Sequence, residues 1–318
     1  MSGSTSTDPQ TAAVSSGLTT VAITGASGMV GGELSKNLAS EGRKVVAITR
    51  GESGAYEDSI RWDPNSGLIN PGRLESVDAV VHLAGENIAG GRWNEKRKAK
   101  IRNSRVQGTR SLVQSIAAVQ QRPKVLVCAS AIGYYGDRGD EKLTESSDAG
   151  SGFLADVCRQ WETEAMAAEK LDVRVVCVRI GVVLSPRGGA LAKMLLPFRL
   201  GVGGVVGSGR QYMSWIGLAD LARAVTYCVD NDSIAGPVNA VTPGAVTNGE
   251  FTRTLGKVLH RPTVFPLPGF AARLVLGEMA DELLLASTRV IPERLQRSGF
   301  QFDHGDLEEC LRFELDRR

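Results

Sequence analysis

Paired cysteines, a strong excess of charge and a long apolar run are all missing from this chain of 318 residues. The five cysteines are scattered and form no Cys-x-x-Cys pair: Cys128, Cys158, Cys177, Cys228 and Cys310. This pattern excludes a disulfide framework and a cysteine-based zinc site, and we expect no metal. It indicates reduced, mostly buried thiols of a cytoplasmic compartment.

The weak net charge and the short apolar runs limit the partners. The formal net charge is +2 at pH 7, which gives no reason to expect a nucleic acid or an anionic membrane. No apolar run reaches the roughly 18 residues that a membrane span needs. The hydrophobic fraction of 42% is ample for a packed core, so we expect a globular protein with a small-molecule substrate.

Residues 1–19 are rich in Ser, Thr and Gly and contain no apolar stretch of the kind found in secretion signals. Such a segment does not bury enough surface to order itself, so we expect a flexible tail. A remnant of an organelle-targeting peptide is the alternative, against which Asp8 and the absence of arginine weigh. The expected location is the cytoplasm, and an organellar stroma or matrix stays open.

The most informative stretch runs from residue 21 to residue 38. A short apolar run leads into Gly25, Gly28 and Gly31, and apolar residues then recur every four positions, as on one face of a helix. A strand that turns tightly into a helix points backbone N–H groups and the positive end of the helix dipole at one spot. The pattern therefore predicts a dinucleotide-binding turn.

Strand-like apolar runs and helical segments alternate along the chain. The expected strands are 21–24, 44–49, 59–62, 77–84, 124–130 and 173–183, and the expected helices include 94–119, 153–170 and 220–229. This alternation predicts an α/β fold: a doubly wound parallel sheet of Rossmann type, covered by helices on both faces.

The composition of the sequence changes after Pro197, where a glycine-rich loop precedes a C-terminal part that is interrupted by several prolines. We expect three parts: the flexible tail 1–19, a dinucleotide-binding Rossmann domain 20–238 that includes the substrate loops, and a smaller α-rich C-terminal lobe 239–318. Because ligands bind beyond the C-terminal ends of parallel strands, the loops that follow the strands should line the site.

The end of the second expected strand indicates which cofactor is bound. Enzymes selective for NAD usually place a carboxylate there, whereas this chain has Arg50. An arginine binds a 2′-phosphate through paired charge-assisted hydrogen bonds, so NADP is favoured over the reading of Arg50 as an ordinary surface residue. Asp63, just after the third expected strand, is either an adenine contact or a turn residue.

Several motifs resemble the extended short-chain dehydrogenase/reductase superfamily: Thr24-Gly25-x-x-Gly28-x-x-Gly31, His82-Leu83-Ala84-Gly85 and Ser130. Three longer segments resemble its atypical NAD(P)-dependent epimerase/dehydratase-like subfamily, the "epimerase family proteins": Leu83-Ala84-Gly85-Glu86-Asn87-Ile88, Ser130-Ala131-Ile132-Gly133-Tyr134-Tyr135-Gly136 and Arg179-Ile180-Gly181-Val182-Val183-Leu184. The resemblance covers about residues 21–302, and many members of this subfamily have no established substrate.

The motifs and the resemblance together imply a cofactor-binding set. Its members are Thr24, Gly25, Ser27, Gly28, Met29, Val30, Arg50, Asp63, Leu83, Ala84, Gly85, Glu86, Arg105, Gly181 and Val182. The implied cofactor is NADP.

The catalytic machinery of the superfamily has only a partial counterpart. In its working members a Tyr hydroxyl transfers the proton, a Lys four residues later lowers the pKa of that Tyr, and a Ser holds the substrate oxygen. Phe153 and Val157 stand at the Tyr and Lys positions, and neither side chain performs these tasks. The catalytic candidates are therefore Ser130, Tyr134 and Tyr135, although both tyrosines are alternatively aromatic packing beside the cofactor.

Two functions follow from the sequence. The first is an NADP-dependent oxidoreductase or epimerase of atypical mechanism that acts on an unidentified small polar substrate. The second is an NADP(H)-binding scaffold or redox-sensing protein with little or no catalysis. Relatives often form dimers through the helices expected at 94–119 and 153–170, but the first is so highly charged that we expect a monomer or a weak homodimer.

Overall fold

A computed structural model describes residues 17–50, 59–68 and 70–316. Eight strands form one sheet in the order β12-β8-β6-β5-β1-β2-β3-β4. Their bounds are β1 Thr20–Thr24, β2 Lys44–Thr49, β3 Ser59–Asp63, β4 Gly67–Leu68, β5 Ala79–His82, β6 Val125–Ala131, β8 Arg174–Ile180 and β12 Gly236–Ala240. Neighbouring strands are parallel except β3 and β4. The sheet winds outward on both sides of β1, which confirms the predicted Rossmann-type fold.

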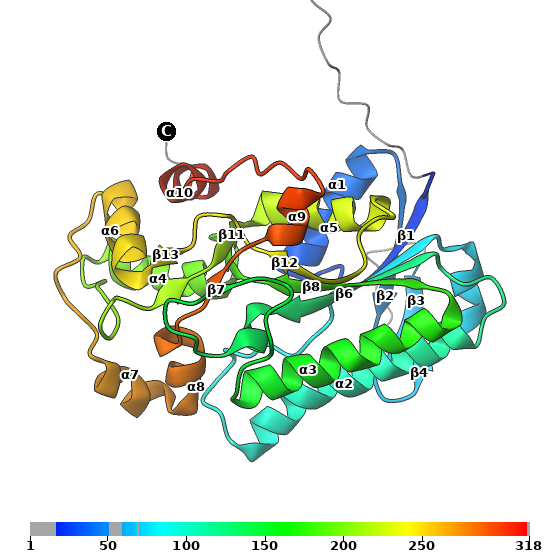
Figure 1. Cartoon of the computed structure of the whole chain (residues 1–318), viewed down its shortest axis with the longest axis horizontal. Helices are drawn as coiled ribbons and strands as arrows, with labels where there is room; N and C mark the ends of the chain where they lie inside the picture. The colour runs from blue at the N-terminus through cyan, green and yellow to red at the C-terminus, as the bar shows by residue number, and fades with distance from the viewer. Residues whose placement is uncertain (1–16, 51–58, 69, 317–318) are drawn as a thin grey trace, which may run out of the picture.

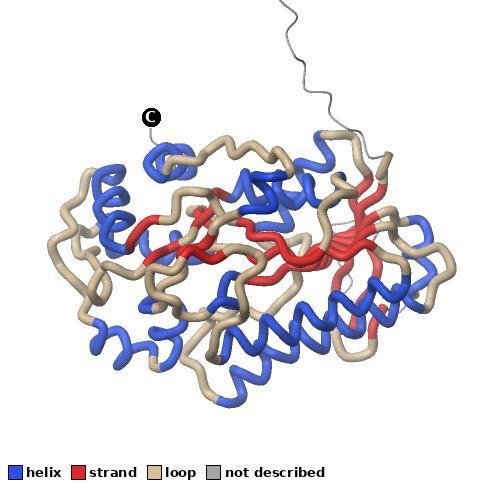
Figure 2. Tube along the Cα trace, viewed as in Figure 1, coloured by secondary structure: helices blue, strands red, loops and turns tan. Residues whose placement is uncertain are grey.

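Helices cover both faces of this sheet (Figures 1 and 2). On one face, α1 (Met29–Ser40) and α5 (Leu218–Asp230) share a core with Val21 and Ile23. On the other face, α2 (Glu95–Ala117) and α3 (Phe153–Met166) pack over Ala22. Because successive side chains of a strand point to opposite faces, β1 contributes alternate residues to both cores.

The last strand expected from the sequence, 173–183, is interrupted at Gly181. It divides into β8 and β9 (Val182–Leu184), and β9 pairs with β11 (Trp215–Gly217) outside the main sheet. A Cβ on Gly181 would lie 2.7 Å from the Ser214 carbonyl oxygen, which leaves room only for glycine. The expected strand 77–84 is also shorter, and the helix expected to reach residue 170 ends at Met166 and continues as the 3-10 turn η3 (Ala167–Leu171).

The remaining helices belong mainly to the C-terminal part of the chain. They are α4 (Gly189–Arg199), α6 (Asn248–Leu259), α7 (Gly269–Leu276), α8 (Glu278–Ala280), α9 (Glu293–Arg297) and α10 (Leu307–Glu314), with the π-helical turn η4 (Asp281–Leu285) after α8. The short strands there are β10 (Tyr212–Met213), β13 (Val246–Thr247) and β14 (Arg289–Val290), which pairs with β7 (Lys142–Leu143) of the first part. The expected division at 238/239 falls inside β12.

Of the expected tail 1–19, residues 17–19 are described and residues 1–16 lie outside the described residues. Leu18 is 7% exposed and packs in the core beneath α1 and α5. The Thr19 backbone donates a hydrogen bond to the Asp78 carboxylate at 2.9 Å. Leu18 and Thr19 therefore belong to the packed part of the described chain. Within the described residues, no helix has the length and apolar character required to cross a membrane.

Candidate functional site

The turn between β1 and α1 has the geometry of a phosphate cradle. Gly25 adopts φ +72°, which favours glycine, and a Cβ there would lie 3.2 Å from the Ala84 backbone nitrogen. At Gly31 a Cβ would lie only 2.2 Å from the Gly25 carbonyl oxygen, so the helix is packed directly on the turn. Gly28 begins the helix as its N-cap, is exposed, and provides no side-chain cap.

The first residues of α1 are open to a ligand. The first N–H groups of a helix have no partner within the helix, and the dipole concentrates positive potential there. Ser27 and Gly28 are exposed, and Met29 and Val30 are half-buried. The sulfur of Met29 lies near Gly188, where a Cβ would approach it to 3.2 Å. The loop after β9 therefore lies beside the helix start, and the cradle fits a pyrophosphate.

Thr24 ties two strands together from inside the core. Its hydroxyl accepts hydrogen bonds from the backbone nitrogens of Leu83 at 3.0 Å and Ala84 at 3.1 Å, and it lies 2.7 Å from Nδ1 of His82. Because the two amides occupy its acceptor positions, the Thr24 hydroxyl donates to Nδ1, so His82 is neutral with its proton on Nε2. Burial, and secondarily the charge of Arg105, lowers the pKa of His82 to about 4. Thr24 therefore holds the start of the loop after β5 in place from inside the core.

The loop after β5 is held by a half-buried arginine. Arg105, on α2, donates to the Glu86 carbonyl oxygen at 3.1 Å, and its guanidinium stacks over Trp161 with 5.2 Å to the ring centroid. A Cβ on Gly85 would lie 3.3 Å from this guanidinium. The Glu86 carboxylate faces the other way and pairs with Arg97 at 2.7 Å. Arg105 thus positions the loop that would face a cofactor.

The two residues predicted to contact the adenosine half lie at the ends of β2 and β3. Arg50 is exposed in a bend directly after β2, and the segment 51–58 that follows lies outside the described residues. The Asp63 carboxylate accepts bonds from the Asn65 backbone at 2.9 Å and from the Ser66 hydroxyl at 2.8 Å. These bonds lower the pKa of Asp63. These bonds form a turn, and the adenine contact of Asp63 stays a prediction.

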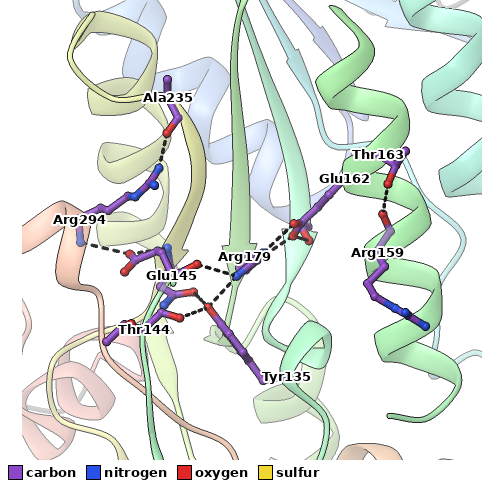
Figure 3. Close-up of polar contacts among 11 residues, drawn as sticks. Tyr135, Thr144, Glu145, Arg159, Glu162, Thr163, Arg179, Ala235 and Arg294 are labelled. Atoms are coloured by element: carbon purple, nitrogen blue, oxygen red, sulfur yellow. Dashed lines mark hydrogen bonds and ion pairs between the residues drawn. The ribbon is translucent and has the colours of Figure 1, made fainter. Parts of the chain in front are cut away.

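A buried polar network lies where β6, β8 and α3 meet (Figure 3). Arg179 on β8 is 3% exposed and binds the Glu162 carboxylate of α3 with two hydrogen bonds of 2.8 Å. The Ser130 hydroxyl donates to the same carboxylate at 2.6 Å. The Ser130 hydroxyl is therefore engaged with Glu162 rather than free to hold a substrate oxygen.

Tyr135 belongs to the same network and is fully buried. Its hydroxyl lies 2.7 Å from Oδ1 of Asn239, to which it donates, and it accepts from Arg179 at 2.9 Å. Burial raises the pKa of Tyr135 to about 12. A hydroxyl that is enclosed and bonded on both sides is poorly placed to exchange a proton with a ligand.

Tyr134 differs from Tyr135 in burial and in hydrogen bonding, the two properties that decide whether its hydroxyl is available for proton transfer. It is half-buried on the 3-10 turn η2 (Ile132–Tyr135) at the end of β6, and its hydroxyl forms no hydrogen bond with a described residue. The guanidinium of Arg179 stacks on its ring with 3.5 Å to the centroid, and the Tyr135 ring meets it edge-on at 5.3 Å. Of the three predicted catalytic hydroxyls, the structure leaves only that of Tyr134 available.

The start of α3 is an apolar cluster. Phe153 is 7% exposed and Val157 is 1% exposed, and both pack with Trp93 and Met279. The Phe153 and Trp93 rings meet edge-to-face at 5.1 Å. No acid–base pair is present at these two positions, which are used for packing.

Glu282 caps the same helix end from the C-terminal part of the chain. Its carboxylate accepts from the backbone nitrogens of Phe153 at 2.9 Å and Leu154 at 3.3 Å. A carboxylate at this position is stabilised by the helix dipole, although burial raises the pKa of Glu282. The cap fixes where α3 begins.

The sequence analysis missed the residues that organise this network, namely Glu162, Arg179 and Asn239. One signal was present: Arg179 interrupts the apolar run of β8, and a charge on a buried parallel strand needs a partner. Nothing in the sequence identified Glu162 as that partner. No group of three or more His, Cys, Asp or Glu residues within the described ranges is arranged to hold a metal ion.

Comparisons with known proteins match nearly the whole chain. Residues 21–240 match the NAD dependent epimerase/dehydratase family, and residues 267–314 match a domain of unknown function, DUF1731. An epimerase family protein of Mycobacterium bovis is 44% identical over 297 residues, which are 93% of this chain and 98% of that protein.

Two solved structures have a similar fold. The crystal structure of human epimerase family protein SDR39U1 with NADPH has a TM-score of 0.85 and 35% identity, covering 94% of this chain and 100% of that one. A nucleoside-diphosphate sugar epimerase from Corynebacterium glutamicum has a TM-score of 0.77 and 36% identity, covering 94% of this chain and 59% of that one.

Proposed function

The chain belongs to the NAD dependent epimerase/dehydratase family, and on this premise we propose that it is an NADPH-dependent oxidoreductase with Tyr134 as the proton donor. The observation that carries the proposal is the unbonded Tyr134 hydroxyl at the end of β6, with its ring held on the Arg179 guanidinium. The substrate class is a small carbonyl compound or the corresponding alcohol, not further identified.

Three features support NADPH as the cofactor. The Gly25–Gly31 turn is too tightly packed for side chains at Gly25 and Gly31, and it ends at the exposed start of α1, where a pyrophosphate is expected. Arg50 is exposed at the end of β2, where a 2′-phosphate is expected. The human relative with 35% identity was crystallised with NADPH. The remaining predicted cofactor contacts, from Leu83 to Glu86 and at Gly181 and Val182, lie at the ends of β5 and β8.

Tyr134 and Arg179 have separate roles in the proposed reaction. NADPH, held at the Gly25–Gly31 turn and by Arg50, would supply the hydride that the carbonyl carbon of the substrate receives. The Tyr134 hydroxyl gives its proton to the carbonyl oxygen, so the products are an alcohol and NADP⁺, and solvent returns a proton to Tyr134. Arg179 fixes the plane of the Tyr134 ring and therefore the position of its oxygen. Epimerisation of an alcohol would use the same proton transfer in both directions.

The test compares hydride transfer in Tyr134→Phe, Tyr135→Phe and Ser130→Ala, measured as NADPH consumption over a panel of carbonyl substrates. We expect Tyr134→Phe to lower kcat by roughly 10²–10⁴-fold, which is the usual contribution of general acid catalysis. Tyr135→Phe and Ser130→Ala should act mainly on stability, because their hydroxyls are engaged in the buried network. Turnover that is unchanged in Tyr134→Phe would refute the assignment.

A second function has its own support. Phe153 and Val157 are buried in an apolar cluster, so the helix position at which the superfamily carries its lysine holds an apolar side chain here. An NADPH-binding scaffold or redox sensor with little catalysis needs no lysine there. It predicts tight NADPH binding in the wild type and in Tyr134→Phe, with no turnover of any carbonyl substrate in either protein.

Assembly and compartment complete the proposal. We propose a monomer or weak homodimer, because α2 exposes the charged side chains of Glu95, Lys96, Lys100 and Arg110. All five cysteines are free and buried, which favours a reducing compartment such as the cytoplasm.

A further inference from the structure

Exposed apolar side chains gather in one region of the molecule. Among the described residues, nine of the ten exposed large hydrophobic side chains lie between residues 196 and 275. We define the apolar face as Leu196, Leu200, Phe265, Phe270, Leu274 and Val275, whose exposed fractions range from 58% to 75%. Proteins that act alone rarely expose a contiguous apolar surface of this kind, so the apolar face calls for a partner.

The segments that form the apolar face are adjacent in space. Isolated bridges pair Gly204 with Val264 and Val206 with Leu267. The connection between α6 and α7 therefore runs along the glycine-rich loop that follows α4. Figure 1 shows α4, α6 and α7 together at the end of the molecule opposite β2 and β3.

Each helix presents its apolar residues on one side. Leu196 and Leu200 are one turn apart near the C-terminal end of α4, and Phe270 and Leu274 are one turn apart on α7. On α7 only Ala272 is buried. This short helix therefore directs most of its apolar surface outward instead of into the core.

The segments that carry the apolar face are basic in sequence, and three of their cations are paired with carboxylates from other segments: Arg187 with Glu33, Lys257 with Glu308 and Arg273 with Asp281. Residues 186–219 and 251–277 contain no Asp or Glu. Their basic residues are Arg187, Lys193, Arg199, Arg210, Arg253, Lys257, Arg261 and Arg273. The net charge of +2 does not reveal that the basic residues are concentrated in these two segments, because the rest of the chain is net acidic.

Two of these cations lie at the apolar face itself. Arg199 directly precedes Leu200, and Nε of Arg261 donates to the Arg199 carbonyl oxygen at 2.8 Å. Both residues are exposed, and neither side chain forms an ion pair with a described residue. Arg273, between Phe270 and Leu274, is paired with Asp281 at 2.8 Å.

We propose that the apolar face docks on an anionic lipid surface. Its Leu, Phe and Val side chains would enter the boundary between headgroups and acyl chains, and Arg199 and Arg261 would contact lipid phosphates. A second copy of the chain fits less well, because two apolar faces meeting would bring unpaired arginines together. This surface modifies the expectation, drawn from net charge alone, that an anionic membrane is not a partner.

The experiment is co-sedimentation of the full chain with phosphatidylcholine vesicles, with and without phosphatidylglycerol. We expect binding to the anionic vesicles, little binding to the neutral ones, and release as added salt shortens the screening length from about 10 Å to about 3 Å. Phe270→Ser/Leu274→Ser and Arg199→Glu/Arg261→Glu should each weaken binding by about tenfold or more, since each cation near such a surface is worth about fivefold.

Matched controls separate the apolar face from general surface properties. Phe313→Ser removes the one exposed large hydrophobic side chain outside residues 196–275 among the described residues. Lys36→Glu/Lys170→Glu reverses two exposed cations elsewhere. Both controls should bind vesicles like the wild type, and every variant should keep the wild-type affinity for NADPH, so this test is independent of the proposed function.

Three results would overturn the proposal. One is equal binding to neutral and anionic vesicles. Another is wild-type binding by either variant of the apolar face. The third is a wild-type protein that binds no vesicles and forms a stable dimer in sedimentation velocity, which Phe270→Ser/Leu274→Ser dissociates. That result would assign the apolar face to self-association.

Discussion

Arg179 lies face to face with Tyr134, its guanidinium carbon 3.5 Å from the centre of the ring. The guanidinium is itself fixed by two hydrogen bonds to Glu162, so the ring rests on a rigid base rather than on a mobile side chain. Glu162 balances the charge of Arg179, and the pair therefore acts on Tyr134 mainly by position and not by a net field. Tyr134, the candidate proton donor, is therefore positioned by residues of two other elements, β8 and α3.

The first prediction concerns this ion pair. Glu162→Ala leaves the buried charge of Arg179 unpaired, and we expect a loss of about 3–5 kcal/mol in the free energy of unfolding. Urea denaturation followed by circular dichroism measures it. The control is Asp156→Ala on the same helix, whose pair with Arg159 is exposed on both sides and should contribute less than about 1 kcal/mol. Equal losses in the two variants would contradict the buried network.

A second prediction separates two glycines of the phosphate turn. Gly28→Val should keep the fold but abolish NADPH binding, because Gly28 is exposed and its new side chain would occupy the space of the pyrophosphate. Gly31→Val should destabilise the protein itself, since its Cβ would overlap the Gly25 carbonyl oxygen at 2.2 Å. Thermal unfolding and calorimetric titration together distinguish the two effects. A folded Gly28→Val protein with wild-type affinity would place the phosphates elsewhere.

The third prediction tests the choice of cofactor. NADPH should bind roughly ten- to a hundredfold more tightly than NADH, because charge-assisted hydrogen bonds of about 1.5–3 kcal/mol form only with the 2′-phosphate. Arg50→Asp should remove this preference or invert it. Isothermal titration of both cofactors against both proteins gives the answer, and equal affinities in the wild type would contradict the role of Arg50.

The fourth prediction follows from the depressed pKa of His82. An unfolded histidine takes up a proton near its ordinary pKa of 6.5, whereas folded His82 does so only near pH 4. The unfolded state thus binds more protons between these values, and stability falls as the pH drops from 6.5 to 4. The loss from this group approaches about 3 kcal/mol, at about 1.4 kcal/mol for each pKa unit.

His82→Asn isolates this contribution, because the Asn oxygen can replace Nδ1 as the acceptor for Thr24 and does not titrate. Urea denaturation at pH 7 and at pH 4.5 should show a smaller acid-induced loss in the variant than in the wild type. Parallel losses in both proteins would show that His82 is not the responsible group.

Local pattern predicted the fold well. The run 21–24, the three glycines and the helical spacing after them all lie between residues 21 and 38, and β2 begins and ends where the sequence indicated. The interruption at Gly181 was not predictable from apolar character, because it depends on the Ser214 carbonyl oxygen packing against it from a distant loop.

The site was predictable only in part, for a similar reason. Ser130, Tyr134 and Tyr135 were identified from their place after a strand, but their sequence context is the same. What separates them is the partners they meet: Ser130 bonds to Glu162, 32 residues away, and Tyr135 bonds to Asn239, 104 residues away. Only Tyr134 emerges with an available hydroxyl, and that distinction exists in the folded molecule alone.

The cap that Glu282 provides to α3 spans 129 residues of sequence, and Arg294 donates its backbone N–H to Glu145 across 149 residues. A chain growing on a ribosome therefore reaches residue 153 long before it can finish that helix end. During synthesis the Rossmann strands have time to assemble while the substrate side remains open. The order of translation thus delays completion of this helix end until residue 282 has been made.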